Sequence, residues 1–147
     1  MTWSPAQHHD DQTVTVPAPL LWTPDVTAVS MSQPVRQLFP ADVIVSHTGT
    51  LTWSRVLRMT VLCDMRRGAG QEEGVTCELK FGSWNYASDQ VVLQPDDDLV
   101  DLSGYFHGSR YQVTAANLTS SEENAGSKPV SYVTARFTFL DQSKKKK

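Results

Sequence analysis

The chain has 147 residues, of which 39% are hydrophobic and 20% are charged, a composition typical of one soluble globular domain. No apolar run approaches the roughly 20 residues that a membrane-spanning helix needs, and the polar stretch Thr2–Asp11 lacks the basic start of a signal peptide. Four of the 13 basic residues form the run Lys144–Lys147, so the rest of the chain is acidic. An acidic body does not suit nucleic acid, and the lysine run is expected to be a disordered, solvated end.

The first half of the chain predicts short strands. Thr13–Val16 alternates polar and apolar residues, as a half-exposed strand does. Asp42–Ser46 and Thr50–Ser54 flank the turn sequence His47-Thr48-Gly49. Because glycine accepts the positive φ of a tight turn, this segment predicts a hairpin. Arg55–Cys63 alternates regularly and predicts one further strand.

A longer strand is predicted for Cys77–Ala87. Alternation along it would place Trp84 and Tyr86 on one face and Asn85 on the other. The apolar run Gln90–Gln94 follows it and stops at a proline-aspartate turn.

The last strands are predicted at Tyr111–Ala115 and Tyr132–Leu140. Between them, Asn117–Pro129 is rich in Ser, Glu, Asn and Gly and predicts a long mobile loop or a hairpin tip. No amphipathic helix of ten or more residues appears. The pattern therefore predicts an all-β fold, a sandwich or barrel, in a single domain over residues 1–143 with the tail 144–147 behind it.

Cys63 and Cys77 are the only cysteines, with 13 residues between them. Such a pair fits a disulfide and an oxidising compartment, although two buried free thiols would also fit the spacing. Zinc is disfavoured because the cysteines do not form a C-x-x-C pair and no histidine is near them in sequence.

Four motifs carry a family resemblance. They are Leu21-Trp22-Thr23-Pro24-Asp25, the loop from Cys63 to Cys77, Lys80-Phe81-Gly82-Ser83-Trp84-Asn85-Tyr86, and Asp101-Leu102-Ser103-Gly104-Tyr105. In this order and spacing, the chain resembles the extracellular ligand-binding domain of the Cys-loop (pentameric ligand-gated) receptors. It is most similar to the soluble acetylcholine-binding proteins of molluscs. The resemblance covers about Trp3–Phe139.

The resemblance implies a twisted, immunoglobulin-like β-sandwich. Matching Trp3-Ser4-Pro5 to the family's Trp-x-Pro implies that the family's N-terminal helix and first strands are absent here. The cysteine loop Asp64–Gln71 is polar, whereas channel subunits carry an apolar motif that presses on the membrane domain. Together with an end after the last strand, this polarity favours the soluble branch.

The family assembles as pentamers and binds ligands between neighbours in a cage of aromatic rings, where a cation is attracted to ring faces. The resemblance makes Trp84 the central cage residue, with Tyr86 two residues beyond it. The alternative for Trp84 is an ordinary core aromatic residue. Val29 stands where the family usually has a cage tyrosine.

The family's adjacent cysteine pair, between two further tyrosines, is missing. Val130 stands at the position of the second tyrosine, and Tyr132 would replace it only if the register shifts by two residues. From the neighbouring subunit, Ile44, Thr52 and Ser54 would line the opposite wall, or they form plain sheet surface.

Other patterns predict little chemistry. Asn117-Leu118-Thr119 is a glycosylation sequon, consistent with secretion. His8–Asp11 lacks a distant partner ligand, and Asp96–Asp98 lacks the spacing of a calcium loop, so no metal site is predicted. No catalytic motif and no cofactor signature appears, so the chain is not expected to be an enzyme.

The sequence therefore predicts a secreted domain, similar to the acetylcholine-binding proteins, for a small cationic ligand of the acetylcholine or nicotine type. Its specificity would be weakened or altered, and it would form a homo-pentamer or co-assemble with full-length relatives. One alternative is a non-binding assembly or decoy subunit, or a truncated product. Another, disfavoured by the polar cysteine loop, is an extracellular fragment of a channel subunit.

Overall fold

The computed structural model describes residues 2–64, 74–105 and 110–142. The polar cysteine loop falls largely outside this range, as does the lysine tail. The predictions for both therefore concern residues outside those described.

The chain forms two compact units that interleave in sequence. Unit 1 comprises Met1–Pro24 and Val35–Arg58, and unit 2 comprises Asp25–Pro34 and Met59–Lys147. The single domain predicted for residues 1–143 stays a prediction.

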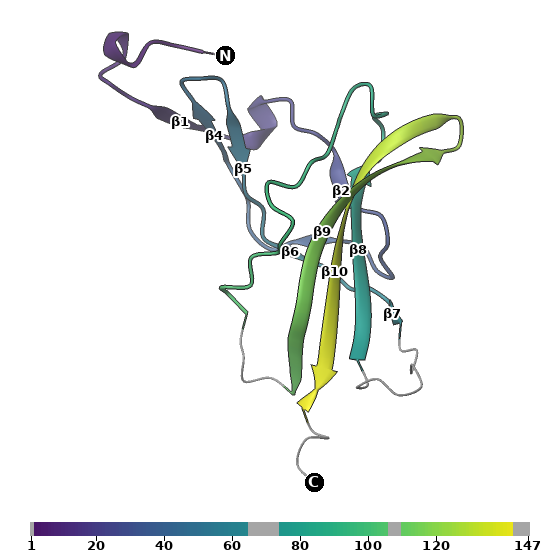
Figure 1. The fold of residues 1–147 in the computed structure, drawn as a ribbon. Helices are drawn as coiled ribbons and strands as arrows, with labels where there is room; N and C mark the ends of the chain where they lie inside the picture. The colour runs from purple at the N-terminus through teal and green to yellow at the C-terminus, as the bar shows by residue number, and fades with distance from the viewer. Residues whose placement is uncertain (1, 65–73, 106–109, 143–147) are drawn as a thin grey trace. The chain divides into compact units, whose positions relative to one another are not determined.

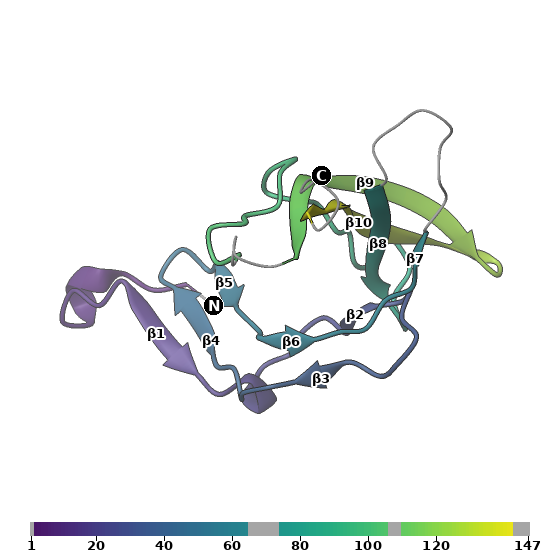
Figure 2. The same ribbon diagram turned by 90° about the horizontal axis from the view of Figure 1, so that it is seen from below.

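Unit 1 contains a three-stranded antiparallel sheet in the order β1-β4-β5 (Figure 2). Its strands are β1 (Thr13–Val16), β4 (Val43–Ser46) and β5 (Leu51–Trp53). The turn between β4 and β5 uses Gly49 at φ 93°, and Ser46 N donates to Thr50 O at 2.8 Å. The predicted hairpin is confirmed, because glycine accepts this φ without steric cost.

The two faces of this sheet differ in chemistry. Paired residues share a face of a sheet. Val43 and Val45 are each 1% exposed at the centre of the apolar face, which also carries Val14, Val16, Leu51 and Trp53. The opposite face carries Thr13, Thr15, Ile44, Ser46 and Thr52. The alternation in the sequence therefore decides which side of the sheet is buried.

Smaller elements complete unit 1. β3 (Arg36–Gln37) and β6 (Leu57–Arg58) form a two-stranded antiparallel pair. Two short 3-10 helices, η1 (Pro5–Gln7) and η2 (Ala18–Leu20), each contain a proline near the start.

The single strand predicted over Arg55–Cys63 is wrong. Only β6 forms within it, while Val61 makes one bridge to Met31 and β7 (Cys63–Asp64) pairs with β8. The run alternates correctly, but its backbone hydrogen bonds go to different partners along its length. Alternation reports burial and says nothing of which strand is the partner.

Unit 2 contains a five-stranded antiparallel sheet in the order β2-β8-β10-β9, with β7 also paired to β8 (Figure 1). The long strands are β8 (Gly74–Ser83), β9 (Tyr111–Ala125) and β10 (Lys128–Asp141). β2 (Val26–Ala28) adds to the other side of β8. The strands predicted at Cys77, Tyr111 and Tyr132 are therefore present, with shifted ends.

The long loop predicted for Asn117–Pro129 is not a loop. β9 and β10 stay paired up to Ala125 and Lys128, and Gly126 at φ 71° makes the tip. The alternative expectation, a hairpin tip, is confirmed for these last residues. The polar side chains of this stretch are exposed, but its backbone groups form hydrogen bonds with β10. Polar composition alone therefore does not distinguish a loop from an exposed strand.

The apolar run Gln90–Gln94 is not a strand. The Ser131 hydroxyl accepts a hydrogen bond from Leu93 N at 2.9 Å and approaches Leu93 O at 3.4 Å. A buried side chain on β10 thus replaces the ladder partner that a strand would need.

The predicted disulfide is confirmed. Cys63 on β7 and Cys77 on β8 are register partners, with Cα atoms 4.3 Å apart and their sulfurs bonded. In the chain-entropy model, closing a loop of this length stabilises the fold by about 3 kcal/mol.

The all-β class is confirmed, since all named strand pairs are antiparallel and the described residues contain no α-helix. Within the described ranges, no helix has the length and apolarity to cross a membrane.

Candidate functional site

Trp84 lies in the turn directly after β8, and its side chain is 78% exposed. The strand predicted to run to Ala87 ends at Ser83, so the alternation that paired Trp84 with Tyr86 does not hold there. Tyr86 is half-buried. This exposure argues against the alternative that Trp84 is a core aromatic residue. An exposed indole on a fixed turn is accessible to a ligand.

Asp25 fixes this turn from a distant part of the sequence. Its Oδ1 accepts a hydrogen bond from Ser83 Oγ at 2.5 Å. Its Oδ2 accepts two more from Asn85, from the backbone N at 2.8 Å and from Nδ2 at 2.6 Å. Ser83 Oγ in turn accepts from Tyr86 N at 2.9 Å. The residues on both sides of Trp84 are thereby held while its ring stays in solvent.

The electrostatics of Asp25 agree with this role. Partial burial disfavours the charged carboxylate, but the hydrogen bonds from Ser83 and Asn85 outweigh it and hold the Asp25 pKa below its ordinary value. The carboxylate is therefore ionised at neutral pH, which strengthens each hydrogen bond it accepts.

Val29 lies beside β8, at the end of β2. Its backbone N donates to Lys80 O at 2.8 Å, and the next residue, Ser30, accepts a hydrogen bond from Lys80 N at 2.9 Å. The Val29 side chain is 37% exposed. Valine presents an apolar surface here, without the ring or hydroxyl of a tyrosine.

Tyr132 on β10 contacts a cation that belongs to the chain itself. Lys80 Nζ lies 4.2 Å from the centroid of the Tyr132 ring and 2.5 Å from Glu123 Oε2 on β9. The Lys80 ammonium, through a hydrogen bond, lowers the pKa of Glu123. Three strands thus converge in one charged, aromatic cluster, which we call the Lys80 cluster: Lys80, Glu123 and Tyr132.

The absence of a side chain at Gly82 leaves room for the Tyr132 ring. The two residues are register partners on β8 and β10, and a Cβ at Gly82 would lie 2.5 Å from ring atoms Cδ1 and Cε1. The ring therefore covers the backbone of β8 two residues before Trp84. Val130, the other predicted cage position, is 8% exposed and offers a ligand little surface.

The residues predicted for the neighbour's wall belong to unit 1. Ile44 and Thr52 are register partners on β4 and β5, and Ser54 directly follows β5. All three side chains are exposed, on a sheet face rich in hydroxyl groups.

Sequence reasoning missed the residues that support the site. Asp25 and Ser83 lie inside quoted motifs, but nothing in the sequence indicates that they bond to each other. Lys80 lies in the same motif as Trp84. Glu123 lies in the stretch predicted to be a long mobile loop or a hairpin tip, and neither expectation includes its ion pair with Lys80.

The remaining motif forms a local turn. Ser103 N donates to Asp101 Oδ1 at 2.8 Å, and this hydrogen bond lowers the pKa of Asp101. Tyr105 O–H donates to Tyr111 O at 2.6 Å.

Asn117 of the sequon is exposed on β9, opposite Arg136. Among the described residues, no group of three or more His, Cys, Asp and Glu could hold a metal ion.

The sequence is similar to proteins of a known family. Residues 1–140 match the family model of the neurotransmitter-gated ion-channel ligand binding domain. The neuronal acetylcholine receptor subunit alpha-5 of Bos taurus is 26% identical over 124 residues, covering 84% of this chain and 26% of that protein. The acetylcholine receptor subunit alpha of Danio rerio is 23% identical over 112 residues, covering 76% of this chain and 25% of that protein.

A nematode protein matches similarly. Ligand-gated ion channel 4 of Caenorhabditis briggsae is 25% identical over 115 residues, covering 77% of this chain and 18% of that protein. The chain thus spans between 18% and 30% of the length of these and similar curated relatives. The matched family is a receptor ligand-binding domain, which confirms the prediction of a non-enzymatic protein. On a family match that spans nearly its whole length, the chain belongs to the neurotransmitter-gated ion-channel ligand-binding domains.

Proposed function

We propose that this chain is an extracellular domain, similar to the acetylcholine-binding proteins, that binds a small organic cation of the acetylcholine or nicotine type at an interface between subunits. The observation that carries the proposal is the exposed Trp84 indole on a turn held by Asp25. A fixed, exposed ring face attracts a quaternary ammonium by about 0.5–1 kcal/mol, and more once the contact is desolvated.

The composition of the site favours weakened or altered specificity. Val29 supplies no ring, Val130 is nearly buried, and the Tyr132 ring is engaged by Lys80. An aromatic cage with fewer free faces binds a cation less tightly, since each face contributes separately.

The opposite wall would come from a second copy or from a full-length relative. Ile44, Thr52 and Ser54 are the exposed residues suited to that role. A homo-pentamer or a mixed pentamer would then create the binding site. Light scattering coupled to size-exclusion chromatography tests this: a monomer with acetylcholine bound at Trp84 would contradict binding between subunits.

Titration of acetylcholine and of nicotine against tryptophan fluorescence tests the binding itself. We expect a saturable change at millimolar ligand or below in the natural chain. Val29→Tyr should bind more tightly, because it adds a ring beside Lys80 on β8. No change at millimolar ligand in either protein would contradict the proposal.

The Lys80 cluster favours a second candidate, a non-binding assembly or decoy subunit. An internal ammonium already occupies the Tyr132 ring, and it is held there by Glu123. In this case Val29→Tyr would still show no binding. Measurable agonist affinity in the natural chain would eliminate this candidate.

A further inference from the structure

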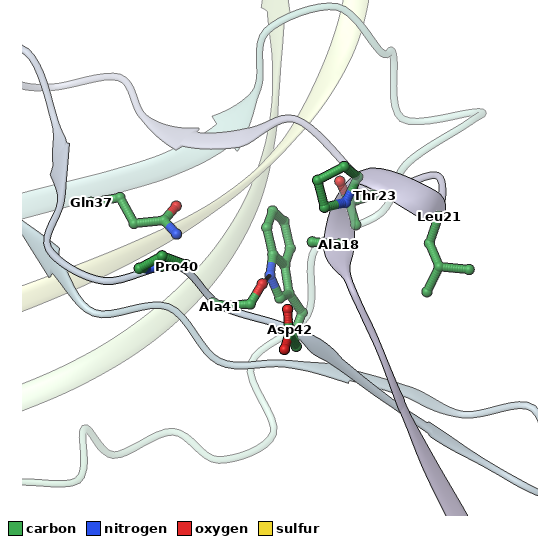
Figure 3. Close-up of a pocket in the computed structure, with 9 residues that line it drawn as sticks. Ala18, Leu21, Thr23, Gln37, Pro40, Ala41 and Asp42 are labelled. Atoms are coloured by element: carbon green, nitrogen blue, oxygen red, sulfur yellow. Dashed lines mark hydrogen bonds between the residues drawn. The ribbon is translucent and has the colours of Figure 1, made fainter.

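Unit 1 contains a pocket of about 410 Å³ that no predicted site residue lines. This volume lies in the range of small-molecule sites. Figure 3 shows Gln37, Pro40, Ala41 and Asp42 on one side of the pocket and Ala18, Leu21 and Thr23 on the other. The nine lining residues are Ala18, Pro19, Leu21, Thr23, Gln37, Pro40, Ala41, Asp42 and Trp53.

The aromatic wall of the pocket is fixed in place. Trp53 Nε1 donates to Ala41 O at 3.1 Å, which holds the edge of the indole against the peptide joining Ala41 to Asp42. Val43, the register partner of Trp53, follows Asp42 directly. Pro19 and Pro40 stiffen the two facing segments. A ligand would therefore meet a preformed surface and cost little ordering entropy.

Two polar side chains of the pocket, Asp42 and Gln37, offer acceptor oxygens, and Thr23 adds a hydroxyl group. The Asp42 side chain is exposed and has no ion-pair partner within the part of the chain that the structure describes. Gln37 Nε2 donates to Phe39 O at 2.8 Å, so its Oε1 remains available to accept. Among the lining residues Asp42 is acidic and none is basic, so the lining side chains carry one formal negative charge; the nearby cation is Arg55, outside the lining.

The Trp53 ring already attracts one cation of the chain. The Arg55 guanidinium lies 4.2 Å from the ring centroid, although Arg55 does not line the pocket. The pocket therefore suits a cation with an apolar body. Its charge can lie beside the Asp42 carboxylate, and its carbon atoms can pack against the Trp53 indole and the two proline rings.

We propose that this pocket binds a compact organic cation, a quaternary ammonium or a protonated amine, with its charge beside Asp42 and its apolar part against Trp53. The site lies wholly within unit 1 and shares no residue with Trp84 or the Lys80 cluster. It is therefore a separate site from the one proposed at Trp84.

A matched pair of probes tests the proposal without any change in the pocket. Choline and its uncharged carbon analogue 3,3-dimethylbutan-1-ol have the same shape and differ in the cation. Both are titrated against Trp84→Ala, which removes the other indole site, while the three remaining indole N–H signals are followed by ¹⁵N NMR. Trp53→Phe identifies the Trp53 signal by its absence.

We expect choline to shift the Trp53 signal saturably and the alcohol to bind at least about fivefold more weakly. Asp42→Asn should weaken choline binding by a similar factor, while the exposed control Asp89→Asn should leave it unchanged. Equal affinity for the two probes, an unaffected Asp42→Asn, or an equal loss in Asp89→Asn would overturn the proposal, as would no saturable shift. The probe comparison stands even if Asp42→Asn fails to fold.

Discussion

Lys80 Nζ lies 4.2 Å from the centroid of the Tyr132 ring, so an ammonium of the chain itself occupies an aromatic face that a ligand could use. Glu123, 2.5 Å from the same Nζ, keeps the ammonium there. Any external cation at this ring competes with a partner that is tethered on the neighbouring strand.

Replacing Lys80 by Gln should therefore tighten acetylcholine binding. The Tyr132 ring is freed, and the Glu123 carboxylate loses its own cation and attracts an external one. We expect a gain of about two- to fivefold, the value of one exposed cation–π contact. Isothermal titration calorimetry of the natural chain and of Lys80→Gln measures it.

Arg136→Gln is the matched control for Lys80→Gln. It breaks another cross-strand ion pair of the same sheet, between Arg136 on β10 and Glu78 on β8, and leaves Tyr132 untouched. An equal gain in Arg136→Gln would mean that the effect comes from the change in the net charge of the chain. A loss of affinity in Lys80→Gln would show that the Lys80 ammonium helps to bind the ligand.

Gly82→Ala should disrupt the Lys80 cluster by displacing the Tyr132 ring. The new Cβ would lie 2.5 Å from two atoms of the Tyr132 ring, which must move or strain β8. We expect a loss of about 1–3 kcal/mol in the free energy of unfolding, as overpacking costs. Gly104→Ala, where nothing lies within 4 Å of the added atom, is the control in urea denaturation. Equal stability of the two variants would contradict the close packing of Tyr132 on Gly82.

Asp25→Asn should loosen the turn that carries Trp84. Both carboxylate oxygens of Asp25 accept hydrogen bonds, whereas an asparagine amide has only one acceptor oxygen. Its NH2 group would face either the Ser83 hydroxyl or the N–H groups of Asn85, which are themselves donors to Asp25. We expect a loss of about 1–3 kcal/mol in unfolding free energy, because the buried Ser83 hydroxyl and the two Asn85 donors lose a charged acceptor. The Trp84 fluorescence should change in the folded state as well. Unchanged fluorescence and stability would show that Asp25 does not hold the turn.

The Asp25 contribution should depend on pH in a defined direction. The folded-state pKa is lowered by the hydrogen bonds from Ser83 and Asn85, so the stabilisation is complete above the ordinary value of 3.8 and is lost as the pH falls through the lowered value. The stability difference between the natural chain and Asp25→Asn should therefore shrink from about pH 6 to about pH 3. A difference that grows over this range would contradict the lowered pKa.

Much of the fold could be predicted because the signal was local. The hairpin around Gly49 follows from one turn residue between two apolar strands. The disulfide follows from two cysteines and no others. These features depend on residues that are close in sequence or unique in the chain.

The features that failed depend on partners far away in sequence. The run predicted as one strand over Arg55–Cys63 bonds to different partners along its length, and pairing with β10 makes the polar stretch before Gly126 a strand. Asp25 supports the turn at Trp84 through hydrogen bonds from Ser83 and Asn85, which lie 58 and 60 positions away in sequence. The family resemblance predicts Trp84 as a site residue, whereas its support by Asp25 depends on the folding of two distant segments against each other.

Calorimetric titration of acetylcholine into the natural chain, Trp84→Ala and Trp22→Ala tests the central claim most directly. Trp22 is also an exposed indole, at 62%, but it lies in unit 1, away in sequence from the Trp84 turn. We predict saturable binding that weakens at least about tenfold in Trp84→Ala and is unchanged in Trp22→Ala. Equal affinity in the natural chain and Trp84→Ala would contradict the claim that the Trp84 ring receives the cation.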